Sequence, residues 1–372
     1  MAYALYTAAI GLSAFLLFLV QPLVHSWIGL KLSLYLTFIL ATGTIAVFSS
    51  EIDWLFKPEM RAQQPVPAEV AWGDAYDTAR SSYPGWTVNS LSRFDSDIFS
   101  LQVSAKTPWR ELRYVWLEPA DGTLRGTTGF YSVQRFFRQV HRHLMLPTKI
   151  GIPAVTILAF PLIVSFVAGF VVYKKFWRGF FRAPRFERKP RIWLADMHRL
   201  AGLWVSWFVL LIALTSVFYF AETLGARAEP FPRPSAVAPR DTPLPEGFAG
   251  AQLDAAIERA RQTLPGLQVR RVLLPSRADR PIRVQGELSA ILVGPRANSV
   301  SVDPLTLEVL GHYTGEELPG YTRISESADP LHFGYFVGYL TKVLWFLFRA
   351  RMTGLSITGV MIYARRIVRR PR

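Results

Sequence analysis

The sequence contains no cysteine among its 372 residues. Disulfide bonds, thiolate metal sites and ordinary cysteine-held iron–sulfur clusters are therefore excluded. The chain also lacks the GxGxxG, P-loop, GxSxG and HExxH motifs, so we expect no nicotinamide or ATP site within it. Any redox cofactor must be held by histidine or by packing.

Apolar residues, in contrast, are abundant at 51% of the chain, and they are gathered in long runs. A hydrocarbon core of ~30 Å needs roughly 20 apolar residues in a helix. Four runs meet this length: Ile28–Phe48, Ile150–Tyr173, Ala201–Phe220 and about Phe336–Tyr363. A fifth, Ala2–Val24, lacks the basic start and cleavage site of a secretory signal, so we treat it as a possible span. The fold class predicted is an integral membrane α-helical bundle.

The formal net charge of +15 is concentrated beside these runs. Lys174–Arg199 holds nine Lys and Arg against Glu187 and Asp196, and residues 365–372 hold five more arginines. Short basic segments next to spans mark the cytoplasmic side of a membrane. The charge therefore sets topology and does not favour a nucleic-acid partner. It places Glu51–Lys149 and about Ala221–His332 on the far side.

These two far-side regions repeat one pattern. The first has a helical pattern that ends near Pro84-Gly85 and is followed by a strand, and the second has the same order around Pro265-Gly266. We predict two copies of a small α+β module, the second preceded by a proline-rich linker from Ala228 to Pro245. The membrane part also repeats, because His25 and His198 are each followed by Gly-Leu at the same spacing, and by Thr-Gly or Thr-Ser seventeen residues on.

The predicted domain plan runs through the chain in nine parts. They are an apolar N-terminal segment and possible span (1–24), a transmembrane helix (25–50), a periplasmic module (51–134), a periplasmic lead-in with a transmembrane helix (135–173), a basic cytoplasmic loop (174–200), a transmembrane helix (201–221), a periplasmic linker with the second module (222–331), a transmembrane helix (332–366) and a cytoplasmic tail (367–372).

Four of the six histidines stand near the ends of different apolar runs. A b-type haem in a membrane needs one imidazole from each of two helices, because its iron is bound axially. We pair His25 with His198 near the cytoplasm, and His141 with His332 near the periplasm. His143 is the alternative to His141. Such histidines can also be plain interfacial residues, but two pairs on opposite faces favour two haems.

Further residues are predicted around the histidines. Gly29 and Gly202 lie four residues after His25 and His198, on the same helical face, where they leave room for a porphyrin edge. His312 is expected to be a surface residue.

Arginines interrupt the last apolar run. An arginine at bilayer depth costs ~2.5–3.5 kcal/mol on insertion scales, so Arg349 and Arg351 should face something anionic or watery, such as haem propionates. Snorkelling is the alternative, and a polar transport pathway is another. Arg135, Arg138 and Arg142 precede the second clear span, where propionates, an anionic ligand or solvent would satisfy them.

Several motifs resemble one known family. His25-x-Trp-x-Gly-Leu, Trp193-x-x-Asp196-x-His198, Leu331-His332-Phe-Gly and Ile357-Thr-Gly resemble the PepSY-associated transmembrane family across nearly the whole chain. The resemblance implies two PepSY-like modules and a bacterial inner-membrane location. It is nearest to ferric-siderophore reductases of the ferrioxamine-utilisation type, which implies two b haems held by His25, His141, His198 and His332.

One departure from that family affects the ligand assignment. Many relatives have His-Lys-Lys where this chain has Tyr173-Lys174-Lys175, so a ligand pair that uses this histidine is impossible here and His25 is favoured as the partner of His198.

The predicted function is a di-haem b oxidoreductase that reduces Fe(III) in a periplasmic siderophore, such as a ferrioxamine-type hydroxamate, during iron uptake. Its electron donor would be a quinol or a cytoplasmic reductase, and no catalytic residue is expected beyond the haems. The alternative is a non-enzymatic membrane regulator whose modules bind an envelope protein or a protease.

Overall fold

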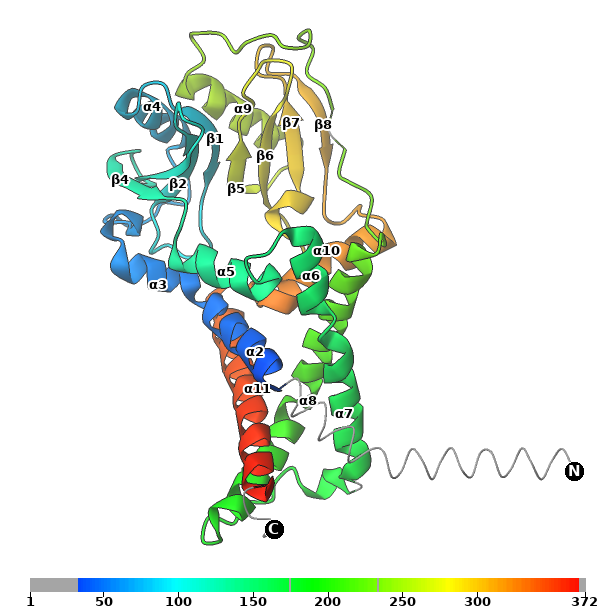
Figure 1. Cartoon of the computed structure of the whole chain (residues 1–372). Coiled ribbons are helices and arrows are strands. Elements are labelled where there is room, and N and C mark those ends of the chain that lie inside the picture. Colours follow the sequence, from blue (N-terminus) through cyan, green and yellow to red (C-terminus); the bar gives the residue numbers. More distant parts are fainter. Residues whose placement is uncertain (1–32, 174, 233, 368–372) are drawn as a thin grey trace, which may run out of the picture. The chain divides into compact units, whose positions relative to one another are not determined.

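The computed structural model describes residues 33–173, 175–232 and 234–367 and divides the chain into two compact units (Figure 1). The membrane unit comprises Met1–Val47, Phe137–Ala226 and Val343–Arg372. The sheet unit comprises Phe48–Phe136 and Arg227–Lys342. The predicted residues His25 and Gly29, and the possible span Ala2–Val24, lie outside the described residues.

Helices make up the described part of the membrane unit. Their bounds are α2 (Ser33–Val47), α5 (Val133–His143, from the sheet unit into this one), α6 (Thr148–Thr156), α7 (Ala159–Val172), the short 3₁₀ turn η2 (Phe176–Arg178), α8 (Pro190–Thr223) and α11 (Gly338–Ile367). Two stretches are long and apolar enough to cross a membrane, Thr148–Val172 and Ile192–Thr223, and the number rises to four if each of two bent helix pairs is one span. The protein is therefore a membrane protein with two to four candidate spans.

The α7–α8 hairpin matches two of the predicted runs, with one difference at each helix. Pro161 cannot donate to the carbonyl of Ile157, and the first run is divided there into α6 and α7. The second helix begins at Pro190, well before Ala201. The prediction was too short because it counted apolar residues only, whereas Asp196 and Arg199 continue the helix as an ion pair.

A single antiparallel sheet of eight strands forms the centre of the sheet unit. The strands are β1 (Thr87–Ser92), β2 (Leu101–Lys106), β3 (Leu112–Leu117), β4 (Leu124–Gly129), β5 (Gln268–Leu273), β6 (Ile282–Glu287), β7 (Ser299–Val302) and β8 (Val309–Tyr313). Their spatial order is β4-β3-β2-β1-β5-β6-β7-β8. The helical elements of the unit are α3 (Ser49–Phe56), η1 (Pro58–Met60), α4 (Trp72–Ser82), α9 (Gly250–Thr263), η3 (Pro295–Ala297) and α10 (Gly320–Phe333).

The two predicted modules are present as α4–β1–β2–β3–β4 and α9–β5–β6–β7–β8. They are joined, however, because β1 pairs with β5 through Ser90–Leu273, Leu91–Val272 and Ser92–Arg271. The helices also meet at their first turns, where Gly73 N–H donates to Asp254 (2.9 Å). Reciprocally, Gly250 N–H donates to Asp77 (2.8 Å). Pairing in this way hides one edge strand from each copy.

The two faces of this sheet differ in chemistry. Leu91, Val103, Val272 and the strand residues on their side of the sheet face α4 and α9 and form the main apolar core. Their neighbours in sequence point to the other side, which we call the polar face. It carries Ser90, Ser92, Gln102, Ser104, Arg271, Arg283, Gln285, Ser299 and Ser301.

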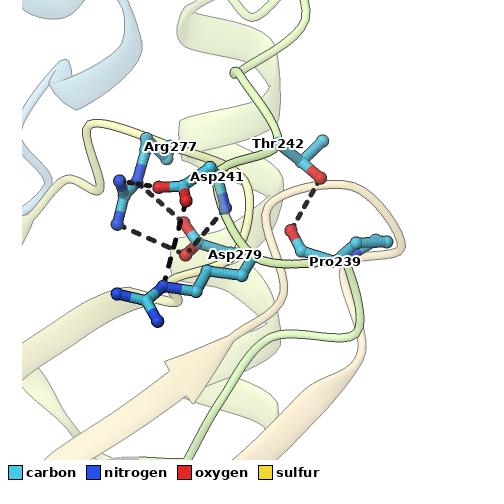
Figure 2. A network of polar contacts seen from close by, with 6 residues as sticks. Pro239, Asp241, Thr242, Arg277 and Asp279 are labelled. Carbon is cyan, nitrogen blue, oxygen red and sulfur yellow. Dashed lines mark hydrogen bonds and ion pairs between the residues drawn. The ribbon is translucent and has the colours of Figure 1, made fainter.

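The proline-rich linker is fastened to the second module. Figure 2 shows Arg277, in the β5–β6 connection, paired with both Asp241 and Asp279, and the Thr242 hydroxyl donating to the carbonyl of Pro239 (2.7 Å). Asp241 N–H also donates to Asp279 (3.3 Å). These contacts fix the path of the chain before α9, so the linker is a packed part of the sheet unit.

Candidate functional site

His141 lies near the end of α5 and its ring packs against α2. Its Nδ1 is 2.9 Å from the carbonyl oxygen of Ile39 and 3.5 Å from the hydroxyl of Thr42. A Cβ at Gly43 would lie only 2.5 Å from the ring atom Cε1. The absence of a side chain at position 43 is therefore what lets the imidazole reach the backbone of α2.

Arg349 of α11 lies at the same place. Its guanidinium donates to the carbonyl of Gly43 (3.1 Å), and the residue is 7% exposed. Burial, together with the charge of Arg349, lowers the pKa of His141 to about 4, against the opposing effect of the hydrogen bond with Ile39. The imidazole is consequently neutral at pH 7. Arg351, two residues further on, is exposed instead.

His198 lies in the third turn of α8 and contacts α11. Its Nδ1 is 2.9 Å from the hydroxyl of Thr358, and that hydroxyl lies 2.8 Å from the carbonyl of Gly354. A Cβ at Gly359 would lie 3.5 Å from Cε1 of His198, an ordinary contact. His198 is thus positioned by a side chain of α11, whereas His141 is positioned by the backbone of α2.

Two glycines near His198 have space around them. A Cβ at Gly202 would meet only a methyl group of Leu355, at 3.9 Å, and a Cβ at Gly354 would meet nothing within 4 Å. Gly202 follows His198 by one helical turn and shares its face, and Gly354 accepts the Thr358 hydroxyl. The surroundings of His198 are therefore open where those of His141 are tightly packed.

Both hydrogen bonds select the same imidazole tautomer. A carbonyl oxygen can only accept, so His141 donates from Nδ1 to Ile39. The single hydroxyl proton of Thr358 is directed to Gly354, which leaves the oxygen to accept from Nδ1 of His198. With Nδ1 donating, Nε2 is the ring nitrogen left to bind a metal in each case. A metal-bound histidine is held in this way, with the other ring nitrogen donating to a carbonyl or similar acceptor.

The two histidines lie at opposite ends of one helical hairpin. His141 precedes α6, and His198 is near the start of α8, which packs along α6 and α7 in the antiparallel direction (Figure 1). Asp196 fixes the His198 end: its carboxylate accepts from Nε of Arg185 (2.9 Å) and pairs with Arg199. Arg185 lies in the basic loop, so this pair ties the loop to α8.

The remaining predicted residues are distributed between the units. His143 is half-buried, and its carbonyl packs against Gly151 of α6. His332 belongs to the sheet unit, where it is 7% exposed at the end of α10 and contacts the ring of Phe333. Its pairing with His141, like that of His25 with His198, stays a prediction. His312 is exposed on β8.

The predicted arginines before the second span differ from one another. Arg135 donates to the hydroxyl of Tyr114 (2.7 Å) within the sheet unit, and Arg142 is exposed. Arg138 belongs to the membrane unit. Across residues 33–173, 175–232 and 234–367, no group of three or more His, Asp or Glu side chains is arranged to hold a metal ion.

Sequence reasoning missed the partners of the histidines. Thr42-Gly43 and Thr358-Gly359 are the two Thr-Gly pairs that meet His141 and His198. Both pairs are visible in the sequence, but the repeat had aligned the first with Thr215-Ser216. The hydroxyl of Thr215 donates instead within its own helix, to Leu211 and Ile212.

Comparison with known protein families gives one match, and it covers most of the chain. The family described as the PepSY-associated TM region matches residues 23–366. A search of curated proteins finds no match. The matched region contains both Thr-Gly pairs, His141, His198 and the whole eight-stranded sheet. The chain therefore belongs to the PepSY-associated TM region family.

Proposed function

We propose that this protein is a di-haem b oxidoreductase of the bacterial inner membrane that reduces Fe(III) held in a periplasmic siderophore. The observation that carries the proposal is that Nδ1 of both His141 and His198 is engaged by an acceptor on a neighbouring helix, which leaves Nε2 as the nitrogen able to bind a metal. They lie at opposite ends of the α6–α8 hairpin. This donor set fits two axially bound haems, one toward each side of the membrane.

Haem, when bound, supplies reversible one-electron chemistry between ferric and ferrous iron. The residues of the chain hold and tune it. The Ile39 carbonyl and the Thr358 hydroxyl orient the two rings and raise the basicity of their Nε2 atoms. Arg349 adds a buried positive charge beside His141. The open surroundings of Gly202 and Gly354 provide space next to His198.

The predicted pairing names the residue that would join each of these histidines in holding a haem. His25 would complete the haem of His198, since position 173 is a tyrosine in this chain. His332, which the sequence pairs with His141, is buried at the end of α10. His143 is the alternative to His141, and it is half-buried.

The substrate would be an Fe(III) chelate such as a ferrioxamine-type hydroxamate. Siderophores bind Fe(III) far better than Fe(II), so the transfer of one electron from a quinol or a cytoplasmic reductase releases the metal with the chelator intact. The basic loop 174–200 would face the cytoplasm, and the sheet unit the periplasm. No proton-transferring side chain is needed for this reaction.

The first test is the visible spectrum and haem content of the protein purified after haem-replete expression. We expect a Soret band and about two haems per chain, and about half of that haem in each of His198→Ala and His141→Ala. His312→Ala is the matched control, because that histidine is exposed on β8. A spectrum without a Soret band, or full haem content in both variants, would overturn the proposal.

A second test concerns the substrate. The dithionite-reduced protein, mixed anaerobically with a ferric hydroxamate siderophore, should be reoxidised while Fe(II) appears at a trapping chelator. Haem that is reduced and stays reduced under these conditions would point to a different electron acceptor. The His312→Ala variant should react at the unaltered rate.

A further inference from the structure

The polar face of the sheet carries two arginines near its centre, and a third, Arg135 of α5, reaches the same face from outside the sheet. Arg271 of β5 and Arg283 of β6 are diagonal neighbours, since Arg271 is opposite Gln285 and Arg283 is opposite Leu273. Tyr114 of β3 is on the same face, and its hydroxyl accepts from Arg135. We call Arg135, Arg271 and Arg283 the arginine trio.

None of the three guanidiniums has a carboxylate partner among the described residues. The side chains of Arg271 and Arg283 form no hydrogen bond or ion pair with any residue in the described ranges, and the guanidinium of Arg135 contacts the Tyr114 hydroxyl and the ring of Phe130, the latter at 4.2 Å. Arg270, the next residue along β5, pairs with Glu287 at 2.9 Å. The shortage of acidic partners is therefore specific to the polar face.

The positions of these cations are unfavourable without an anion. Burial and the adjacent charge of Arg283 lower the pKa of Arg271, which means that the folded protein opposes its charge. Like charges on neighbouring strands destabilise a sheet. A fold that keeps both arginines charged and unpaired is stabilised when an anion neutralises them.

Hydrogen-bonding groups extend from the arginines across the sheet. One row of directly opposed residues runs Trp116, Gln102, Ser92, Arg271, Gln285, Ser299 and Tyr313. In this row the Ser299 hydroxyl is buried, at 1% residue exposure, and has no hydrogen-bond partner. Buried polar groups normally have partners.

The two ends of this row are already covered within the sheet unit. Trp116 packs with Met60 and Phe99 at one end, and Phe231 of the linker stacks on Tyr313 at the other, with ring centroids 4.7 Å apart. Arg271 lies between them, and its side chain keeps surface open to solvent although its charged end is partly desolvated. The free part of the polar face is therefore its cationic centre.

We propose that the centre of the polar face is a binding site for a small molecule bearing carboxylate or phosphate groups, held by Arg271, Arg283 and Arg135. Guanidinium groups bind such oxyanions through two parallel hydrogen bonds, which a lysine cannot do. Serine and glutamine side chains of the adjacent strands bind the remaining oxygen atoms. As an extension that rests on the proposed function, ferric chelates that carry carboxylates are better substrates than chelates that lack them.

The test is calorimetric titration of the oxidised full-length protein with citrate, with redox-inert gallium(III) citrate and with inorganic phosphate. We expect saturable one-to-one binding of at least one probe, weakened about tenfold or more in Arg271→Gln/Arg283→Gln. The matched control is Arg259→Gln/Arg280→Gln, which removes two exposed charges of the same unit, one of them on α9. It should bind within about twofold of the unaltered protein.

Two results would overturn the site: no binding of any probe, or equal weakening in the control pair, which would indicate general charge attraction. Thermal unfolding without ligand keeps the test interpretable. Because repulsion is removed, the Arg271→Gln/Arg283→Gln protein should unfold at the same temperature as the unaltered protein or higher. If that variant does not fold, Arg271→Lys/Arg283→Lys should fold and still bind more weakly, and unaltered binding there overturns the site. No step requires haem, so failure here is distinct from failure of the proposed function.

Discussion

The rings of His141 and His198 are held in place by two different kinds of hydrogen-bond acceptor. Each imidazole meets a Thr-Gly pair on a neighbouring helix and donates from Nδ1. His141 donates to a backbone carbonyl, and its ring occupies the space that a Cβ at Gly43 would need. His198 donates to the side chain of Thr358, with space beside Gly202 and Gly354.

The difference shows which residues control each site. At His141 the acceptor belongs to the backbone, so no side-chain replacement removes it, and the vulnerable feature is the close approach permitted by Gly43. At His198 the acceptor is one hydroxyl group, so a single isosteric substitution removes it. In the pair Thr42-Gly43, substitution of the glycine should therefore have the larger effect on the histidine. In the pair Thr358-Gly359, substitution of the threonine should have the larger effect.

The largest effect is expected for Gly43→Ala. The new methyl group would collide with the His141 ring, which must move away from Ile39. Overpacking of this kind costs about 1–3 kcal/mol, and we expect about half the haem to be lost. Haem content and thermal unfolding are the measurements. Gly169→Ala, in α7 with nothing within 4 Å of its Cβ, is the control and should keep both values. Normal haem content in Gly43→Ala would refute this account of the His141 site.

The second effect is expected for Thr358→Val, which keeps the shape of the side chain and removes the acceptor of His198. Loss of such a supporting partner typically weakens metal binding by about 10–100-fold. The haem bound at His198 should therefore dissociate faster, as measured by transfer to apomyoglobin. Thr358→Ser retains the hydroxyl and should restore slow transfer. If Val and Ser behave alike, the hydroxyl does not orient His198.

The membrane spans and the duplicated module were predictable because they depend on local patterns. Apolar runs of sufficient length predicted the helices at Thr148–Val172 and Ile192–Thr223. The order of helix, Pro-Gly turn and strand predicted both modules. Their fusion into one sheet was not predictable, because pairing of β1 with β5 joins strands about 180 residues apart through backbone hydrogen bonds, which carry little sequence signal.

In the candidate site, too, some features follow from local sequence patterns and others depend on contacts between distant segments. His141 and His198 were found from their positions beside apolar runs, and the buried place of Arg349 fits the rule that an intramembrane arginine turns inward. Arg351 is exposed among the described residues, and what it faces stays a prediction. Two residues of separation in a helix place side chains on different faces, so the pair could not share one environment. The roles of Thr42 and Thr358 needed the structure, since each depends on a contact between distant helices.

A smaller effect, confined to one site, is expected for Arg349→Gln. Arg349 binds the Gly43 carbonyl, and its charge acts on His141. Removing a positive charge favours the oxidised form of a nearby haem, so the midpoint potential of the His141 haem should fall by on the order of tens of millivolts. Redox titration should show this shift in one of two components. Arg351→Gln is the control, because that side chain is exposed, and should move neither component. Equal shifts in both variants would contradict a local role for Arg349.

The smallest effect is expected for Thr42→Val, the counterpart of Thr358→Val. The Thr42 hydroxyl is 3.5 Å from Nδ1 of His141, whereas the Ile39 carbonyl is 2.9 Å away and remains in place. The hydroxyl also donates to that carbonyl, at 3.0 Å, and its removal leaves the acceptor fully available to the imidazole. The rate of haem transfer from the His141 site should therefore change by less than about twofold. A loss as large as that in Thr358→Val would mean that His141 depends on a side chain after all, and the distinction between backbone-held and side-chain-held histidines would fail.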